Sequence, residues 1–388
     1  MKINEIEISG FKGIPHLVIH PKQINILVGK NNTGKTSVLE AIFSTLRVSM
    51  SGMQIKYGQH LSSLINVNKK ESKVVVKLEN ENKYLLLRRP ELKEIIPEFK
   101  KQLIDRIKSI SHGANNKNGW EKAEEIVDKI LSKNDLLSEI EKTAITIESG
   151  NEKLYIFSYT PLILKEIEPL LDYISKINPH GTPKRLIPII LSNPRFSHFE
   201  GNKKSEKVST FIEDLAVGER LDINKSTVDK IQNYLKDKKI LKCLERFDFD
   251  KLFFRDDKKE YEIPYSFMGD GFKCLIGLIA QTSIENKIVL IEEPENHMHP
   301  AYIKEFIRQM IVFSETNDMQ FFITTHSSDI LDVVSTDMLE PKYQEYLSKE
   351  LDIISLDTLG DDILVRELTK KDASEELENL KIDLRGNE

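Results

Sequence analysis

The segment GKNNTGKTS, residues Gly29–Ser37, constrains the fold of this chain more than any other. An apolar run, Ile24–Val28, precedes it, and a run with helical spacing of apolar residues, Val38–Phe43, follows it. A buried strand that turns through a glycine loop into a helix is the starting unit of an α/β fold. We therefore expect an α/β protein whose central sheet contains the strand before the loop.

The same segment matches the Walker A pattern GxxxxGK[ST], which holds a phosphate chain. Glycine lets the backbone approach phosphate oxygens, and the N–H groups at the helix N-terminus form an anion site. Lys35 is expected to reach the β- and γ-phosphates, and the Thr36 hydroxyl to ligate Mg²⁺. The residues expected to bind the nucleotide here are Gly29, Asn31, Asn32, Thr33, Gly34, Lys35, Thr36 and Ser37.

Two carboxylates follow a second apolar run in IVLIEEPENHMHP, residues 288–300. Ile288–Ile291 has the continuous apolar character of a buried parallel strand, and α/β sheets bind ligands at the carboxyl ends of such strands. Glu292 is expected to hold Mg²⁺, directly or through water, and Glu293 to polarise the attacking water as a general base. The usual metal-side residue is Asp, so Glu292 reaches one methylene further.

A third apolar run, Phe321–Ile323, leads into the sequence TTHSSD, which contains His326. A lone histidine is more often structural. This one lies just past a strand that is expected to end at the same edge of the sheet as Glu292 and Glu293, where it can touch a γ-phosphate. The predicted catalytic residues are therefore Glu293 and His326.

A second glycine-containing helix start lies in YSFMGDGFKCLIGLIA, residues 265–280. Ser266, Gly269 and Gly271 precede or open an apolar helix, so they provide another N-terminus suited to phosphate. The segment has no lysine and hydroxyl pair of the Walker type. We interpret it as a half-site that contacts nucleotide only together with a complete phosphate loop; the alternative is an ordinary glycine turn before a helix.

Composition excludes several classes of protein. The chain has 388 residues, 39% of them apolar and 30% charged, with a net charge of −6, so no global positive charge indicates a nucleic-acid partner. The two cysteines, Cys243 and Cys274, form no disulfide framework or zinc pattern, which fits a reducing compartment. No signal peptide or membrane-spanning run is present, so we expect a cytoplasmic protein without a membrane partner.

The region between the two halves of the phosphate site reads as an insertion. Lys73–Glu79 and Lys83–Arg89 alternate as a hairpin, and two runs with helical spacing, from Pro97 to Ile110 and from Trp120 to Ile140, predict an antiparallel helical arm. Short strands and a helix at 161–177 follow. The expected partition is 1–90 for the N-terminal part of the ATPase lobe, 91–180 for the helical insertion, 181–340 for the C-terminal part of the lobe and 341–388 for a β/α tail.

The order of these motifs resembles ABC-type ATPases of the SMC, RecF and OLD (overcoming lysogenisation defect) group. The matching pieces are the strand and FKG turn in Ile6–Gly13, GKNNTGKTS, SFMGDGFK, LIEEPENHMHP and TTHSSD, and the last two are most similar to the OLD-like branch. The resemblance implies an ABC-type P-loop NTPase head, with a mixed or parallel sheet core, an antiparallel β lobe and here an inserted helical arm.

The resemblance also implies that two heads enclose two ATP molecules in a homodimer or higher homo-oligomer. Ser266–Gly271 would then be the signature segment that contacts the partner's γ-phosphate, Asn296–His299 the segment that crosses the interface, and His326 the switch histidine. The signature departs from LSGGQ because Asp270 separates its glycines, and no Q-loop glutamine can be assigned. Arg195 is a candidate contact to nucleotide or partner.

Three functions remain open at the level of sequence. The first is an ATP-driven switch that regulates a separate effector protein in defence against foreign DNA. The chain itself lacks a Toprim nuclease site, because the tail has Asp361-Asp362 but no DxD pair. The DxD at Asp248–Asp250 lies upstream, before the signature segment. The second is a RecF-like repair ATPase that binds double-stranded DNA, and the third is a nucleotide-bound scaffold with negligible hydrolysis. Basic residues that would serve DNA binding, or simply face solvent, are Lys69-Lys70, Arg88-Arg89, Lys100-Lys101, Lys203-Lys204 and Lys236–Lys242.

Overall fold

The computed structural model describes residues 2–46, 62–110, 117–150, 152–157, 160–177, 209–212, 225–237, 243–248, 251–256, 259–282 and 288–379. Two sequence predictions lie outside these residues: the contact from Arg195 and the basic pair Lys203-Lys204. Of the basic run Lys236–Lys242, only Lys236 and Asp237 are described.

The central layer is a six-stranded sheet in the order β15-β14-β3-β13-β12-β8. Its strands are β3 (Ile24–Val28), β8 (Ser209–Ile212), β12 (Ile288–Glu292), β13 (Gln320–Thr324), β14 (Leu351–Leu359) and β15 (Asp362–Leu368). Five of them run parallel, and β15 pairs with β14 in the antiparallel direction. The apolar runs before the phosphate loop, the carboxylates and the histidine are thus β3, β12 and β13, side by side.

A second six-stranded sheet is antiparallel throughout, in the order β2-β1-β4-β5-β6-β7. Its strands are β1 (Ile3–Phe11), β2 (Ile14–Ile19), β4 (Glu71–Leu78), β5 (Asn82–Arg88), β6 (Ile145–Ser149) and β7 (Glu152–Ile156). The predicted hairpin is β4 and β5. The segment 91–180 contributes β6 and β7, which pair next to β5, so this sheet runs on from the N-terminal lobe into the insertion.

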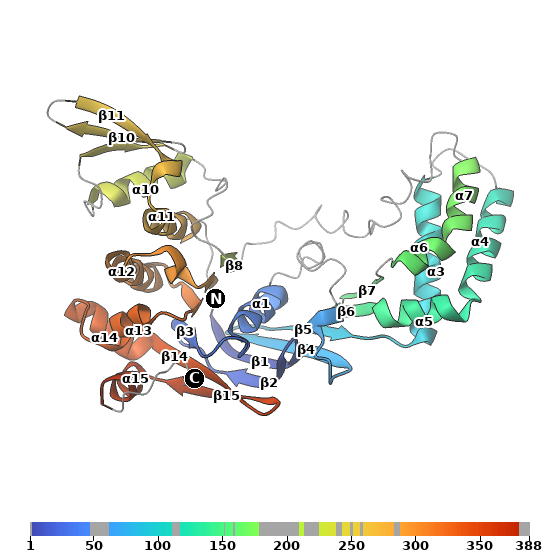
Figure 1. Cartoon of the computed structure of the whole chain (residues 1–388), viewed down its shortest axis with the longest axis horizontal. Coiled ribbons are helices and arrows are strands. Elements are labelled where there is room, and N and C mark those ends of the chain that lie inside the picture. The colour runs from blue at the N-terminus through green and yellow to red at the C-terminus, as the bar shows by residue number, and fades with distance from the viewer. Residues whose placement is uncertain are drawn as a thin grey trace.

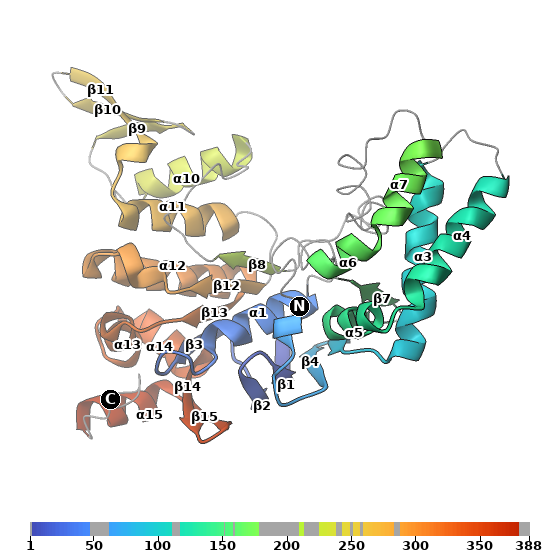
Figure 2. The same ribbon diagram turned by 45° about the vertical axis from the view of Figure 1, so that its right-hand side comes forward.

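Helix α1 (Lys35–Leu46) lies between the two sheets (Figure 2). Its apolar side chains, such as Leu39 and Ile42, are fully buried with Val76 of the antiparallel sheet and Phe322 of the parallel sheet. The other face of the parallel sheet is covered by α12 (Pro300–Asn317), α13 (Ser328–Ser335), α14 (Pro341–Glu350), α15 (Lys370–Ser374) and η4 (Glu375–Asn379). Because both faces are covered, the strands read as continuous apolar runs.

The insertion forms a helical bundle at one end of the antiparallel sheet (Figure 1). It contains α3 (Leu92–Ile110), α4 (Lys117–Leu131), α5 (Asn134–Thr143), α6 (Pro161–Glu166) and α7 (Glu168–Ile177). The bundle has a core of its own, in which the rings of Phe99 and Phe157 meet edge to face at 5.0 Å. The helical arm is therefore a small packed unit rather than two bare helices.

Three helix boundaries predicted from the sequence are wrong. The first helix begins at Leu92 and holds Pro97 inside it, although proline removes a backbone donor. The second run is interrupted around Lys133, whose extended backbone starts α5. The helix expected over 161–177 is divided at Ile167, just before Pro169, because proline disfavours helical continuation.

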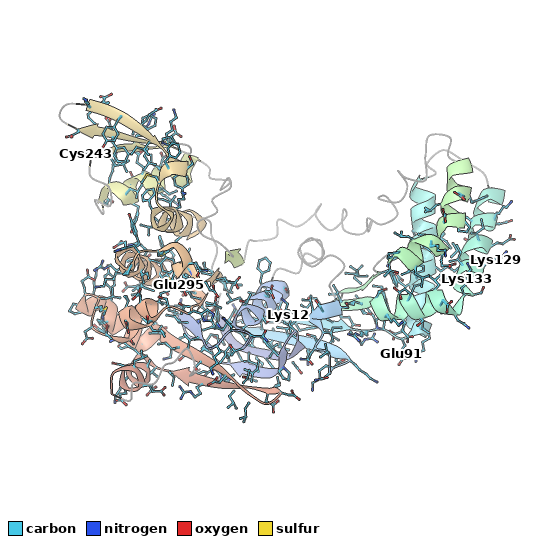
Figure 3. The ribbon with its side chains drawn as sticks, in the orientation of Figure 1. Lys12, Glu91, Lys129, Lys133, Cys243 and Glu295 are labelled. Carbon is cyan, nitrogen blue, oxygen red and sulfur yellow. The ribbon has the colours of Figure 1, made fainter. Side chains whose placement is uncertain are left out.

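A third lobe carries the second glycine segment. It consists of α10 (Lys225–Asp237), β9 (Leu244–Phe247), β10 (Lys251–Asp256), β11 (Lys259–Pro264), the short η2 (Tyr265–Phe267) and α11 (Asp270–Thr282). The antiparallel sheet β11-β10-β9 packs on α10 and α11 around Phe254 and Phe272. Cys243, labelled in Figure 3, is a free, exposed thiol of this lobe.

The described helices include none that is both long enough and apolar enough to cross a membrane. The fold class is confirmed: an α/β P-loop head with a mixed sheet, an antiparallel β lobe and an inserted helical arm.

Asp352 on β14 offers a test of how the sheet is packed. Burial raises the pKa of its carboxyl to about 6, and the nearby Glu367 carboxylate acts in the same direction, against Lys22. A folded-state pKa above the unfolded value of about 3.9 means that ionised Asp352 destabilises the fold; the effect is absent at acid pH and complete above pH 6. We expect Asp352→Asn to raise the free energy of unfolding by about 1–3 kcal/mol at pH 7.5 and by roughly half as much at pH 5.

Urea unfolding at the two pH values measures this difference. The exposed Asp357 lies on the same strand, so Asp357→Asn is the matched control and should leave stability unchanged at both. A gain for Asp352→Asn that does not depend on pH would contradict the assignment.

Candidate active site

The phosphate loop is tightly supported by the strand beside it. Gly29 has φ of +143°, and a Cβ on it would lie 2.2 Å from the carbonyl oxygen of Leu356 on β14. Gly34 has φ of +95° and Asn32 φ of +67°, so two more residues adopt backbone that favours glycine or asparagine. The buried Thr33 donates its hydroxyl to the carbonyl of Lys30 at 3.0 Å. Gly29 and Thr33 thus shape the loop.

Lys35 lies inside this loop. Its ammonium donates to the carbonyl oxygens of Gly29 at 2.8 Å and Lys30 at 2.7 Å. Burial lowers the pKa of the Lys35 ammonium, and the negative charges of Glu293 and Glu295 counteract that shift. The predicted phosphate ligand is therefore a desolvated cation held at the start of α1, where the helix dipole also favours an anion.

Thr36 and Glu292 are brought together as the sequence predicts. The Thr36 hydroxyl on α1 donates to Oε1 of Glu292 at the end of β12. Hydroxyl and carboxylate oxygens are hard ligands of the kind that Mg²⁺ prefers, and Mg²⁺ commonly takes few protein ligands and completes its shell with phosphates and water. The described residues contain no cluster of three or more His, Cys, Asp or Glu suited to a metal. Thr36 and Glu292 offer two adjacent oxygens of the kind that fits Mg²⁺ bound together with phosphates.

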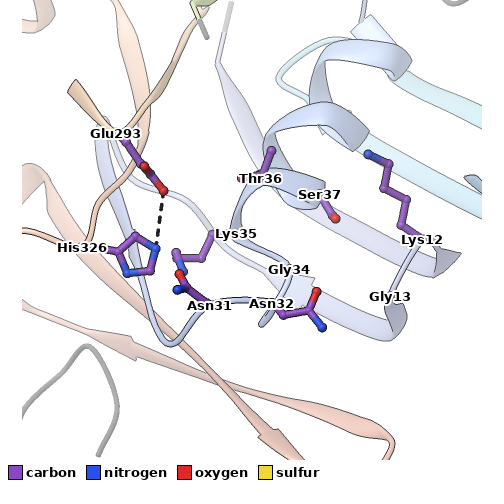
Figure 4. Close-up of a pocket in the computed structure, with 10 residues that line it drawn as sticks. All are labelled: Lys12, Gly13, Asn31, Asn32, Gly34, Lys35, Thr36, Ser37, Glu293 and His326. Atoms are coloured by element: carbon purple, nitrogen blue, oxygen red, sulfur yellow. Dashed lines mark ion pairs between the residues drawn. The ribbon is translucent and has the colours of Figure 1, made fainter. Parts of the chain in front are cut away.

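Glu293 and His326 face each other across the strand ends, with His326 Nε2 lying 3.5 Å from Glu293 Oε1 (Figure 4). Glu293 adopts a left-handed φ of +40°, which is rare for a residue with a side chain and is found preferentially at functional sites. Asn296 donates its amide to the other oxygen of Glu293 at 3.0 Å. The carboxylate is therefore fixed from two sides.

These groups surround one cavity of about 350 Å³. Its lining consists of Lys12, Gly13, Asn31, Asn32, Gly34, Lys35, Thr36, Ser37, Glu293 and His326. Figure 4 shows Lys12 and Gly13 on the side of Ser37, opposite Glu293 and His326. Lys12 and Gly13 were not predicted as site residues, although the FKG turn between β1 and β2 was among the motifs that resemble the family.

The second glycine segment does not line this cavity. Ser266 is exposed in η2, and Gly269 is exposed before α11, where a Cβ on it would meet nothing within 4 Å. Gly271 is buried against the ring of Tyr302, 3.0 Å from the position of a Cβ. These three residues therefore lie in the third lobe, outside the cavity lining.

Fold and site together define a P-loop nucleotide hydrolase. A sequence profile described as AAA ATPase domain matches residues 1–331, and the chain belongs to this family. The protein is an ATPase, as the sequence predicts.

Several known proteins are similar to this chain. An ATP/GTP phosphatase of Helicobacter pylori is 23% identical over 359 residues, which are 86% of this chain and 87% of the relative. DNA replication and repair protein RecF of Nitrosococcus oceani is 48% identical over 44 residues, 11% of this chain and 12% of RecF. The SMC head domain from Thermotoga maritima is 10% identical, with a TM-score of 0.47, and the match covers 95% of this chain and 99% of that one. The OLD-like subtype stays a prediction.

Removing the Lys35 ammonium tests its predicted role. We expect Lys35→Ala to weaken ATP binding at least about 100-fold, because hydrogen bonds to charged groups contribute about 1.5–3 kcal/mol each and 1.4 kcal/mol is tenfold in affinity. Calorimetric titration with ATP and Mg²⁺ measures the change. The exposed Lys30 belongs to the same loop, and Lys30→Ala should stay within about threefold of the wild type. Equal affinity of the two variants would contradict the role.

Proposed function

We propose that this ATPase hydrolyses ATP with the residues gathered around the cavity. Lys35 holds the β- and γ-phosphates, and Thr36 with Glu292 holds Mg²⁺, which when bound neutralises phosphate charge. Glu293 accepts the proton of the attacking water, and His326 contacts the γ-phosphate. The observation that carries this assignment is the meeting of Glu293 and His326, from the ends of two neighbouring strands, beside the Lys35 loop.

We further propose that the site is completed by a second copy of the chain. The cavity of one chain has the phosphate loop, the carboxylates and the histidine but none of Ser266, Gly269 and Gly271 in its lining. Ser266 and Gly269 are exposed at a helix start, where backbone N–H groups are available to an anion outside their own chain. A homodimer around two ATP molecules would supply each cavity with the missing half-site.

The dimer is proposed to act as a switch for a separate effector protein. ATP would hold the two heads together, and hydrolysis would release them. The helical insertion has its own core and stands away from the site, so it offers an independent surface for another protein. The motifs LIEEPENHMHP and TTHSSD resemble those of the OLD-like branch, and this resemblance supports a role of the switch in defence against foreign DNA.

DNA binding is a second candidate, favoured by the local match to the repair protein RecF. Against it, two of the predicted basic positions are neutralised by carboxylates: Lys100 pairs with Asp128, and Arg88 pairs with Glu94 at 3.0 Å. Duplex binding that ATP strengthens and salt weakens would support this candidate.

Replacing Glu293 with glutamine tests the general base. Glu293→Gln keeps the shape of the side chain but accepts no proton, so kcat should fall at least about 100-fold while ATP affinity is kept. With hydrolysis blocked, a dimer should accumulate with ATP in light scattering after size exclusion. Glu315→Gln, at an exposed carboxylate of α12, is the control. If the wild type turns over ATP and Glu293→Gln does not, the scaffold alternative is excluded. Undiminished turnover in Glu293→Gln would refute the role of Glu293 as general base.

Gly269→Glu tests the half-site. The open space around Gly269 accommodates a side chain within its own chain, but a carboxylate there would repel a partner's phosphate, so ATP binding should persist while turnover is lost. Met338→Glu adds the same charge at an exposed residue of another lobe and should remain active.

Mixing chains sharpens this test. Lys35→Ala lacks a working loop and Gly269→Glu a working half-site, so an equimolar mixture of two inactive variants should regain up to about a quarter of wild-type turnover through heterodimers. A mixture without activity would count against the composite site.

A further inference from the structure

Glu295 lies in the short turn η3 (Pro294–His297), between the end of β12 and the start of α12 (Figure 3). Its carboxylate reaches across to the neighbouring strand end. Oxygen Oε1 accepts two hydrogen bonds there, from the Thr325 hydroxyl at 2.7 Å and from the backbone N–H of His326 at 2.8 Å. One oxygen of Glu295 thus binds both Thr325 and the backbone of His326.

Thr325 is in turn tied to the phosphate loop. It is fully buried, and its N–H donates to the carbonyl of Leu27 at 3.1 Å, two residues before Gly29. Its hydroxyl oxygen also accepts the N–H of Ser327 at 2.9 Å. The backbone on both sides of His326 is therefore held by hydrogen bonds, and the Thr325 hydroxyl that accepts from Ser327 donates to Glu295.

The second oxygen of Glu295 adds a cost of desolvation to this arrangement. Oε2 is buried and has no hydrogen-bond partner among the residues that the structure describes. A desolvated carboxylate oxygen without a partner destabilises a fold, and such groups in native proteins call for an explanation other than stability. The retained carboxylate points to a role in the site.

The turn itself directs Glu295 to this place. Glu293 takes its left-handed backbone immediately before Pro294, and the N–H of Glu293 donates to the carbonyl of Thr324 at 3.0 Å. The chain therefore turns back over the end of β13, and the side chains of Glu293 and Glu295 meet His326 from the same turn. Glu293 contacts the imidazole and Glu295 contacts the main chain of the same residue.

We propose that Glu295 is a positioning residue that holds His326 in place opposite Glu293 and the Lys35 loop. The inference rests on the proposed function, in which Glu293 and His326 act on ATP and water. Glu295 contacts neither ATP nor the attacking water. It sets the orientation from which His326 contacts the γ-phosphate, and a small displacement of such a group is sufficient to slow the reaction.

Three substitutions distinguish the effect of the length of the Glu295 side chain from the effect of its charge. Glu295→Ala removes both hydrogen bonds and should lower kcat about 30-fold. Glu295→Asp keeps the charge but shortens the side chain, and should lower kcat about as much. Glu295→Gln loses the charge but keeps an amide oxygen able to accept from Thr325 and His326, and should stay within about fivefold of the wild type. In all three, ATP affinity should stay within about threefold of the wild type. Lys35 keeps its hydrogen bonds in the loop, and Glu293, whose charge acts more strongly on Lys35 than that of Glu295, is retained.

An active Glu295→Asp with an inactive Glu295→Gln would show that charge, not position, matters, and would overturn the proposal. So would kcat of Glu295→Ala within twofold of the wild type. The matched control is Glu305, a partly buried carboxylate on α12 that accepts hydrogen bonds from Tyr234 at 2.7 Å and Gln309 at 2.9 Å. Glu305→Ala should lower the thermal midpoint while kcat is kept.

A double-mutant cycle with His326→Ala shows whether the effect of Glu295→Ala on kcat depends on His326. A merely structural role of Glu295 would not produce such a dependence. If Glu295 acts through His326, the roughly 30-fold effect of Glu295→Ala should shrink to less than about threefold when His326 is already alanine. Equal effects in both backgrounds would overturn the inference.

The cycle also distinguishes a failure of the proposed role of His326 from a failure of the positioning role of Glu295. Unchanged kcat in His326→Ala would overturn the proposed role of the histidine and this inference with it. A lowered kcat in His326→Ala beside an unchanged kcat in Glu295→Ala would overturn the positioning role alone. If Glu295→Ala fails to fold, Glu295→Asp carries the same comparison.

Discussion

The parallel register of three neighbouring strands is the constraint on which the rest of this structure depends. Leu27 of β3 pairs with Thr324 of β13, and Thr324 pairs with Glu292 of β12. Because the strands are in step, the residues that follow them leave the sheet at one level. The phosphate loop, the two carboxylates and the histidine therefore meet, although almost 300 residues separate the first from the last.

Much of this arrangement follows from local sequence. Buried parallel strands are continuous apolar runs, so β3, β12 and β13 were visible, and polar residues directly after such runs predict a site at the carboxyl edge. Lys35, Glu293 and His326 could therefore be predicted to lie together without knowledge of strand order. The phosphate loop was the most readable part, because its glycines and Asn32 satisfy backbone requirements that few other residues can meet.

What the sequence did not show are contacts set by the tertiary fold. Lys12 and Gly13 reach the cavity only because β1 and β2 belong to a second sheet that packs on α1. Glu295 looked like one more charge in an acidic run, and its bonds to Thr325 and His326 depend on a left-handed turn at Glu293. The helix breaks at Lys133 and Ile167 were missed because apolar spacing continues through them, while the bundle needs the chain to change direction there.

The position of β14 has a consequence for how the protein is made. Strand β3 pairs with β13 and β14, both from the final quarter of the sequence, and the carbonyl of Leu356 lies against Gly29. During synthesis the GKNNTGKTS segment precedes both of these strands, which are complete only once residues 320–359 have been added. Until then the loop has neither neighbour, so a loop shaped to bind a triphosphate requires residues far beyond the first fifty.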